Sequence, residues 1–236
     1  MKYFKSYLHA RILRLMKAFD FQNPVLEAGC GTGETLELLS RQYDIKGVDI
    51  SQEALVQCRV KGLNVEERDL ATIEETFCSV LCIDVIEHVK DDRAFIGHLY
   101  RIMRPGGNLF VLVPSGKMMK DDIFFGHYRR YSKEAIVSLL EEAGFTIRHT
   151  EMFGFPVLYY LRHVMNSISR LKIEAVDPQE RTLKSSFENA FDGSVFARAL
   201  MIPAVERALS GMLQIQNLFA GGKKGFAVIA IAHKKA

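Results

Sequence analysis

A short apolar segment that runs into a glycine-rich turn, VLEAGCGTGE at residues 25–34, constrains the fold of this chain most strongly. Glycine at positions 29, 31 and 33 lets the backbone turn tightly and leaves one face without side chains, so a ligand can lie directly against the main chain. A strand, a glycine turn and a helix in this order begin an open α/β sheet that binds a nucleotide-like ligand at the turn.

An acid at the end of the strand narrows the choice of ligand. In the dinucleotide pattern G-x-G-x-x-G, the turn and the next helix hold a pyrophosphate, which Glu27 would repel. The spacing here is G-x-G-x-G, with Glu34 where the third glycine of that pattern would fall. Both departures disfavour NAD, whereas S-adenosylmethionine suits an acidic, glycine-bared pocket because it carries a cationic amine and a sulfonium beside an adenosine. The predicted cofactor contacts in the turn are Glu27, Ala28, Gly29, Cys30, Gly31 and Gly33.

A second acid supports this prediction. Residues 45–49 form a short apolar segment that ends in Asp49, 20 residues beyond Gly29. An acid at the tip of the second strand of an open α/β sheet can accept hydrogen bonds from both ribose hydroxyls. The alternative is a helix cap, but Ser51 is the better capping residue for the helix expected at 52–61. We therefore predict that Asp49, with Ile50 beside it, contacts the ribose.

Four segments in order resemble the class I S-adenosylmethionine-dependent methyltransferases of the small-molecule type. They are VLEAGCGTGETL at 25–36, GVDIS at 47–51, VLCIDVIEHVKDD at 80–92 and LYRIMRPGGNLFVLVPS at 99–115. The resemblance covers residues from about 20 to 150 and weakens afterwards. It implies a Rossmann-like α/β fold with a seven-stranded, mostly parallel sheet whose last strand is antiparallel. It also implies S-adenosylmethionine as methyl donor and S-adenosylhomocysteine as product.

The resemblance places further cofactor contacts after the third and fourth strands. Asp69 would accept from the exocyclic amine of adenine, with the backbone of Leu70 beside it, although a turn or cap role is the alternative for Asp69. Ligands in such sheets bind outside the carboxyl ends of the strands. The contacts expected at the exit of the fourth strand, where the methionine moiety and the acceptor should meet, are Ile83, Asp84 and His88. Glu87 and His88 line this cleft or simply begin the next helix.

Composition agrees with one Rossmann-like domain and an addition. The 236 residues are 48% hydrophobic and 25% charged, with a formal net charge of +3, which is ordinary for a globular enzyme and gives no footprint for nucleic acid. The four cysteines form no C-x-x-C pair and do not stand with histidines at zinc spacing, so we predict reduced thiols and no metal. The N-terminal residues do not read as a secretion signal, and we expect a cytoplasmic protein.

An amphipathic helix is expected at residues 2–19, where apolar side chains recur at helical spacing. The family resemblance favours a lid over the cofactor cleft for such a segment. The alternative is a helix that packs on the sheet for stability alone.

The loop at 114–131 lies on the active edge of the expected sheet and contains GHYRRYS. His127 is the candidate general base for an acceptor that must lose a proton. Arginines can clamp an anionic acceptor, and tyrosines can stack on it or hydrogen-bond to it. The alternative for the arginines is a solvated loop with one of them in a structural ion pair. The predicted acceptor-binding residues are Tyr128, Arg129, Arg130 and Tyr131.

About 70 residues separate the strand expected at 145–153 from the last strand at 225–233. A structureless loop of this length is improbable in a compact domain, and apolar stripes at helical spacing occur at 157–171 and 205–213. We therefore predict a helical cap at 154–222, inserted between strands 6 and 7 of a domain formed by residues 1–153 and 223–236. The cap encloses a lipophilic acceptor, mediates a homodimer or rests on a membrane surface.

These observations predict an S-adenosylmethionine-dependent methyltransferase that acts on a small molecule, with an oxygen atom of an anionic or lipophilic acceptor preferred. A non-catalytic S-adenosylmethionine-binding regulatory module is the alternative from another class.

Overall fold

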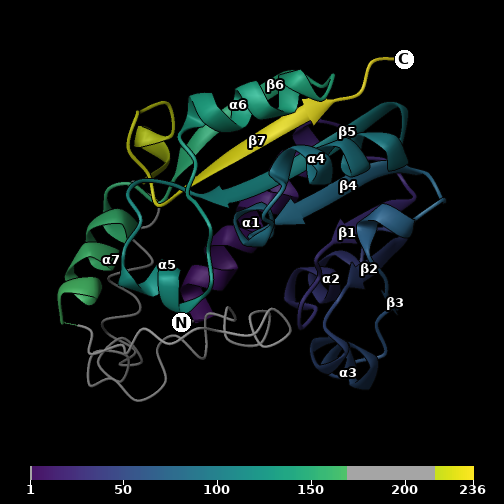
Figure 1. Cartoon of the computed structure of the whole chain (residues 1–236), viewed down its shortest axis with the longest axis horizontal. Helices are drawn as coiled ribbons and strands as arrows, with labels where there is room; N and C mark the ends of the chain where they lie inside the picture. The colour runs from purple at the N-terminus through teal and green to yellow at the C-terminus, as the bar shows by residue number, and fades with distance from the viewer. Residues whose placement is uncertain (1, 169–215) are drawn as a thin grey trace.

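A seven-stranded sheet forms the centre of the molecule in the computed structural model, which describes residues 2–168 and 216–236. Its order is β3-β2-β1-β4-β5-β7-β6, and β7 runs antiparallel to both its neighbours while the other pairs are parallel (Figure 1). The predicted fold class is thus confirmed. The strands are β1 (Val25–Ala28), β2 (Ile45–Asp49), β3 (Val65–Glu67), β4 (Phe77–Ile83), β5 (Met103–Pro114), β6 (Thr146–Phe153) and β7 (Ala227–His233).

Helices cover both faces of this sheet. Apolar side chains alternate along the central strands, as Leu81 faces one side of the sheet while Val80 and Cys82 face the other. Helices α4 and α6 pack on the Val80 face, and α1, α2 and α3 pack on the Leu81 face (Figure 1). The helices are α1 (Lys2–Ala18), α2 (Glu34–Leu39), α3 (Gln52–Val60), α4 (Asp92–Ile102), α5 (Lys120–Phe124), α6 (Lys133–Glu142) and α7 (Val157–Ile168), with 3₁₀ turns η1 (Leu70–Thr72), η2 (Ile86–His88) and η3 (Gln216–Phe219).

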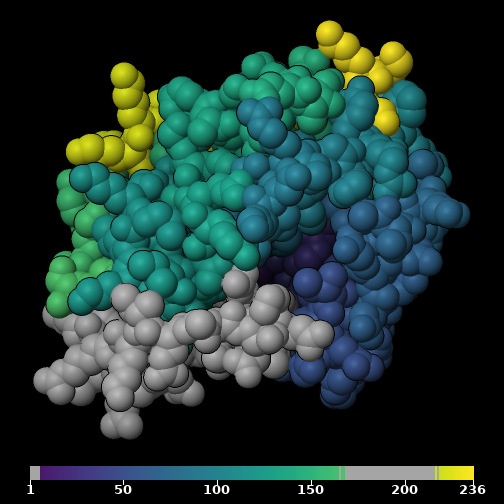
Figure 2. All heavy atoms as spheres, in the orientation of Figure 1, coloured from purple at the N-terminus to yellow at the C-terminus, as the bar shows by residue number. Residues whose placement is uncertain are grey.

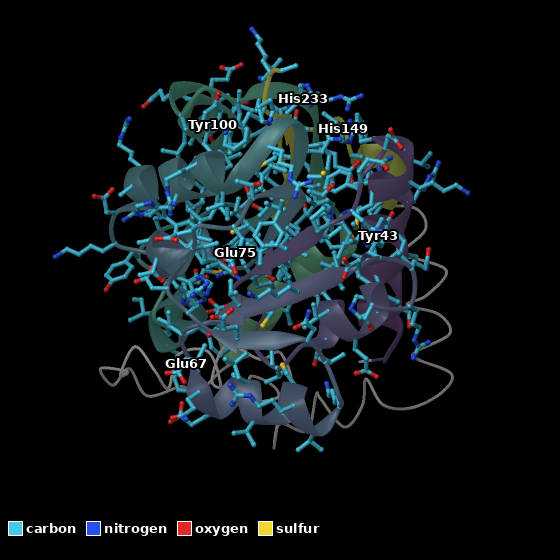
Figure 3. All side chains as sticks on the ribbon, turned by 90° about the vertical axis from the view of Figure 1, so that its right-hand side faces the viewer. Tyr43, Glu67, Glu75, Tyr100, His149 and His233 are labelled. Atoms are coloured by element: carbon cyan, nitrogen blue, oxygen red, sulfur yellow. The ribbon has the colours of Figure 1, made fainter. Side chains whose placement is uncertain are left out.

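The two edges of the sheet lie far apart. Figure 3 shows His149 of β6 and His233 of β7 close together at one end of the molecule and Glu67 of β3 toward the other. Because β7 is antiparallel, His233 pairs with Asn108 near the start of the regular part of β5. His233 therefore lies near the amino-terminal ends of the parallel strands, away from their carboxyl ends, where the ligand site is expected.

Local signals set several element boundaries. The Ser51 hydroxyl accepts from Ala54 N and begins α3, as predicted, and the Ser132 hydroxyl accepts from Ala135 N and begins α6. Strand β4 ends at Ile83, because Asp84 takes a left-handed backbone with φ of 52°. Only a few per cent of residues other than glycine adopt positive φ, Asp and Asn more often than most. This kink directs the chain out of the sheet into η2.

Between β6 and β7, the described residues include helix α7 and the 3₁₀ turn η3. Helix α7 lies beside α5 (Figure 1), and the Arg162 guanidinium on α7 donates to Asp121 and Asp122 on α5. The second predicted stripe, at 205–213, and the polar segment before it fall outside the described residues. Among the helices that the structure describes, none is long and apolar enough to cross a bilayer.

Candidate functional site

A cavity of about 610 Å³ opens at the carboxyl ends of β1, β2 and β4. In Figure 2 this face is hollowed, with dark N-terminal atoms at the floor of the hollow between blue segments of the chain. The cavity is lined by the glycine turn, the end of β2, η1, the exit of β4 and the start of α4. Of the predicted cofactor contacts, every one except Gly33 lines it.

Glycine is required at the turn because the neighbouring wall is too close for a side chain. Gly29 has a φ of 75°, and a Cβ atom built there would lie 2.4 Å from Cγ2 of Val85. A Cβ at Gly33 would meet Cys58 Sγ and Leu63 Cδ1 at 2.7 Å. Gly33 therefore allows close packing of α2 against α3, which explains why it lies off the cavity. The bare backbone at Gly29 fits a ligand that lies against the main chain.

Glu27 supplies a buried carboxyl group to this cavity. Its side chain is 3% exposed, and Oε2 has no hydrogen-bond donor among the described residues. Burial raises the pKa of this carboxyl well above its usual value, and the nearby Cys58 and Asp49 raise it further. A buried carboxylate is stable only when a cation or hydrogen-bond donors satisfy it. The amine of S-adenosylmethionine is such a group, so Glu27 fits the predicted cofactor.

Asp49 organises the turn while it lines the cavity. Its two oxygens accept from Gly31 N at 2.8 Å and from Ser51 N at 2.9 Å. Burial raises the pKa of Asp49, although these backbone hydrogen bonds oppose the rise. Each carboxylate oxygen can accept a further hydrogen bond, so ribose hydroxyls can be bound without breaking the turn.

Asp69 has the capping role that we gave as its alternative, although it also lines the cavity. Its side chain accepts from Ala71 N at 2.8 Å and begins η1. This places the backbone of Leu70 at the cavity wall.

Two acids follow the kink at the end of β4. Asp84 lines the cavity. Desolvation by the surrounding protein raises the pKa of Asp84 to about 7, although the positive charge of Arg130 acts to lower it. Glu87 is 1% exposed, and its Oε2 has no hydrogen-bond donor among the described residues. Burial raises the pKa of Glu87 well above its usual value, and Asp84 adds to this effect. Two acidic side chains therefore lie at the exit of β4, and one of them, Asp84, lines the cavity.

His127 lies just behind the cavity wall. Its ring packs edge-on against that of His88, with the ring centroids 4.6 Å apart and an interplanar angle of 86°. On the other side, Nδ1 of His127 lies 3.2 Å from Oδ1 of Asp122. The chain thus brings His127 to the acid-rich end of the cavity, in contact with a lining residue.

The two arginines of this loop are engaged in ion pairs within the protein. Arg130 is buried, and it donates to Asp122 Oδ1 at 2.8 Å and to the Ser115 carbonyl. Arg129 pairs with Asp92 and donates to the Lys90 carbonyl at 2.6 Å. Both guanidinium groups are thus in ion pairs, where the alternative expected one in a solvated loop, and their geometry gives no support to an anion clamp.

The two tyrosines of the loop differ in how far they are buried. The Tyr131 hydroxyl is bound to Asp92 at 2.8 Å, and this side chain is buried in the core. Tyr128 is 46% exposed. Neither tyrosine lines the cavity, so their role toward an acceptor stays a prediction.

Several cavity residues were not predicted. Leu8 and His9 of α1 line it, whereas Ile12 and Met16 of the same helix are fully buried against the sheet. Helix α1 thus combines a place at the cleft with a packing role. His98 on α4 was also missed, because a residue of an amphipathic helix gives no sequence signal that distinguishes a cavity wall from a solvent face.

Comparison with known proteins gives the family of this chain. A family model described as a methyltransferase domain matches residues 2–150. A ubiquinone biosynthesis O-methyltransferase from Pseudomonas fluorescens is 31% identical over 97 residues, which are 36% of this chain and 42% of that protein. The norajmaline N-methyltransferase of Rauvolfia serpentina is 33% identical over 119 residues, 42% of this chain and 40% of that protein.

A solved structure extends the likeness over nearly the whole fold. The S-adenosylmethionine-dependent methyltransferase from Archaeoglobus fulgidus has a TM-score of 0.59 at 20% identity, covering 97% of this chain and 93% of that one. The chain spans less than half the length of the two curated relatives. The family model, which covers more than half of the chain, confirms both the family and the cofactor predicted from the sequence. This chain belongs to the S-adenosylmethionine-dependent methyltransferase family.

Proposed function

We propose that this chain transfers the methyl group of S-adenosylmethionine to an oxygen atom of a small molecule. The observation that carries the proposal is the continuity of one cavity from Glu27 to Asp84 and His88. A donor held at the glycine turn and an acceptor held at the exit of β4 meet within it. When bound, the cofactor supplies a methyl group on a positively charged sulfur that a nucleophile can attack directly.

The residues of the turn hold and orient the donor. Glu27 attracts its amine, Asp49 accepts from the ribose hydroxyls, and the backbone of Leu70 lies at the adenine end. Holding two reactants in position supplies much of the rate of such a displacement.

His127 takes the proton of the acceptor in this proposal. A carboxylate behind the ring, here Asp122 at 3.2 Å from Nδ1, orients a histidine base and stabilises its charged form. A hydroxyl acceptor must lose a proton and so needs a base. The arrangement therefore favours oxygen, as in the O-methyltransferase relative, over nitrogen, as in the N-methyltransferase relative.

We also propose that residues 154–222 form a cap over the acceptor. The cap is inserted into the domain formed by residues 1–153 and 223–236. Its described helices expose apolar side chains, which are Tyr160, Val164, Leu218 and Phe219. Such a surface suits a lipophilic acceptor, a membrane surface or a second copy of the chain. The cytoplasm is the compartment that we expect.

The test is a screen with radiolabelled S-adenosylmethionine over phenols, hydroxy acids and hydroxylated lipids, with calorimetry of donor binding alongside. We expect His127→Ala to lower kcat by about 100-fold or more, as loss of a general base does, with unchanged donor affinity. His149→Gln, at the far end of the sheet (Figure 3), is the matched control and keeps full activity. Full activity of His127→Ala excludes His127 as the base. Donor binding without transfer to any acceptor favours the regulatory module.

A further inference from the structure

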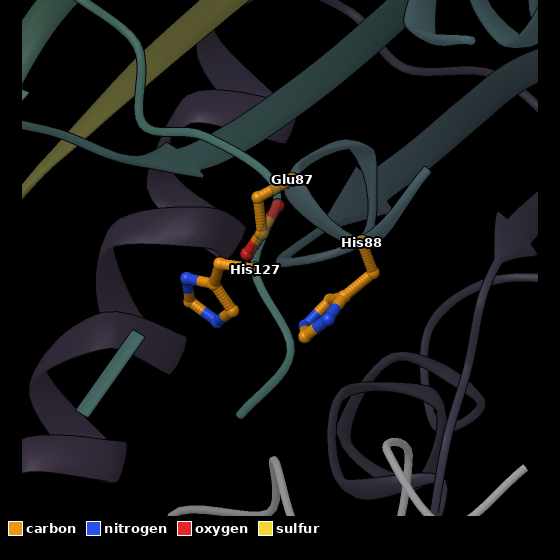
Figure 4. Close-up of side chains that lie close together, drawn as sticks. All are labelled: Glu87, His88 and His127. Carbon is orange, nitrogen blue, oxygen red and sulfur yellow. The ribbon is translucent and has the colours of Figure 1, made fainter. Parts of the chain in front are cut away.

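Three side chains with metal-binding atoms meet at the exit of β4. Glu87 and His88 come from η2, and His127 comes from the loop between α5 and α6. One ligand atom of each lies within 4.8 Å of the others, and Figure 4 shows the three side chains converging from the two segments. A hydrogen bond from Tyr128 N to Glu87 O, 2.8 Å long, ties the segments together. The backbone therefore holds this group in place.

The Glu87 carboxylate has an unmet need for a partner. The side chain is 1% exposed, yet Oε2 has no hydrogen-bond donor among the described residues. Figure 4 shows the carboxylate directed toward the His127 ring. The nearby Asp84 adds negative charge, while Arg130 is bound to Asp122. Buried charges are paired or coordinate metals, because burial without a partner costs several kcal/mol.

His127 has the surroundings of a metal ligand. Metal-binding histidines almost always direct one ring nitrogen to a carboxylate or carbonyl while the other binds the ion. Nδ1 of His127 faces Asp122 at 3.2 Å, and Asp122 is fixed by Arg130 and Arg162. Nε2 is therefore the nitrogen available to an ion.

We propose that Glu87, His88 and His127 bind one divalent first-row transition-metal ion. Two imidazoles and one carboxylate are the protein ligands of several catalytic zinc sites, and imidazole also suits other transition ions. Ligand atoms about 2.0–2.2 Å from one ion lie about 3.3–3.6 Å apart in tetrahedral geometry, so atoms within 4.8 Å of one another need to close by up to about 1.5 Å.

The sequence analysis predicted no metal because these three residues do not stand at zinc spacing. His127 follows His88 by 39 residues, and no cysteine takes part.

The role of the ion rests on the proposed function, although its binding does not. An ion with an open coordination position toward the cavity would bind the acceptor hydroxyl and make it more acidic. His127 then acts through the ion, and a free imidazole base is not needed.

Calorimetric titration of the metal-stripped full chain with Zn²⁺, Mn²⁺ and Mg²⁺ tests the site without any acceptor. We expect one ion per chain, with Zn²⁺ and Mn²⁺ bound more tightly than Mg²⁺. Glu87→Gln and His127→Gln should each weaken binding at least about 100-fold, since loss of an outer partner alone costs 10- to 100-fold. His233→Gln, remote from the cavity, is the control that keeps the affinity of the wild type. If Glu87→Gln fails to fold by circular dichroism, His88→Gln replaces it.

Two results overturn the proposal. One is failure of the folded wild type to bind any of the three ions, and the other is unchanged binding in the ligand variants. Calorimetry with S-adenosylmethionine separates this inference from the proposed function. Donor binding and chelator-resistant methyl transfer without metal binding leave the function standing and refute the site, whereas metal binding without donor binding supports the site and refutes the function.

Discussion

The glycine turn offers a stability test whose size follows from the structure. Gly29→Ala introduces a Cβ atom 2.4 Å from Cγ2 and 3.0 Å from Cγ1 of Val85, at a φ of 75°. Alanine in the left-handed region costs about 1–2 kcal/mol, and overpacking of a tight site costs about 1–3 kcal/mol. The free energy of unfolding should therefore fall by about 2–5 kcal/mol, a large part of the roughly 5–15 kcal/mol that stabilises a domain.

Gly62 separates these two contributions. Its φ is 70°, but a Cβ built there meets nothing within 4 Å. Gly62→Ala should therefore show only the backbone cost of about 1–2 kcal/mol. The excess loss in Gly29→Ala measures the clash with Val85.

A double-mutant cycle then identifies the partner. Val85→Ala removes the two closest atoms and leaves only Cβ, at 3.3 Å. The double variant should recover the overpacking cost of about 1–3 kcal/mol, measured by urea unfolding followed by circular dichroism and linear extrapolation. Effects that add within about 0.5 kcal/mol, or a Gly29→Ala loss no larger than that of Gly62→Ala, would refute the steric argument.

Two further substitutions test the charges of the site. Burial, with Cys58 and Asp49, raises the pKa of Glu27 above its unfolded value, so Glu27 alone should lower the unfolding free energy of the ligand-free wild type as pH rises above about 4.3, by about 1.4 kcal/mol per pH unit until the pKa of the folded state is passed. Glu27→Gln should remove this contribution from the pH slope in urea unfolding, while the contributions of Asp84 and Glu87 remain, and it should weaken donor binding in calorimetry; an unchanged slope means that Glu27 is solvated. Asp122→Asn should lower the unfolding free energy by about 3–5 kcal/mol, because it removes the carboxylate that faces buried Arg130 and Arg162. A loss below about 1 kcal/mol would mean that these ion pairs contribute no more to stability than exposed salt bridges do.

The parts of the fold that depend on local pattern could be predicted from the sequence. The strand before the glycine turn was predicted because an apolar run, a turn and a helix leave few other arrangements. Ser51 marked a helix start because a hydroxyl at that position satisfies a free backbone N–H. Glu27 and Asp49 could be assigned to the cavity because the end of a parallel strand fixes which edge of the sheet they occupy.

The contacts of the acceptor side could not be predicted in this way, because they depend on how distant segments meet. Arg130 forms an ion pair with Asp122, and Asp122 also pairs with Arg162 of α7. The contact of His127 with His88 depends on a loop that folds back onto η2. A motif such as GHYRRYS shows which chemical groups the loop carries. The partners of these groups come from distant segments, and the periodicity of the sequence does not show which segments meet the loop.

Buried carboxyl groups that lack hydrogen-bond donors support a functional role, because packing alone does not explain them. Glu27 and Glu87 are each at most 3% exposed, and each keeps an oxygen without a donor among the described residues. Selection for stability alone would replace such groups, because each lowers the free energy of unfolding. Glu27 lines the cavity at the glycine turn, and Glu87 follows Asp84, which lines the cavity at the exit of β4. The two costs are therefore explained together if a cationic donor and a metal ion satisfy them, one at each end of a single methyl-transfer site.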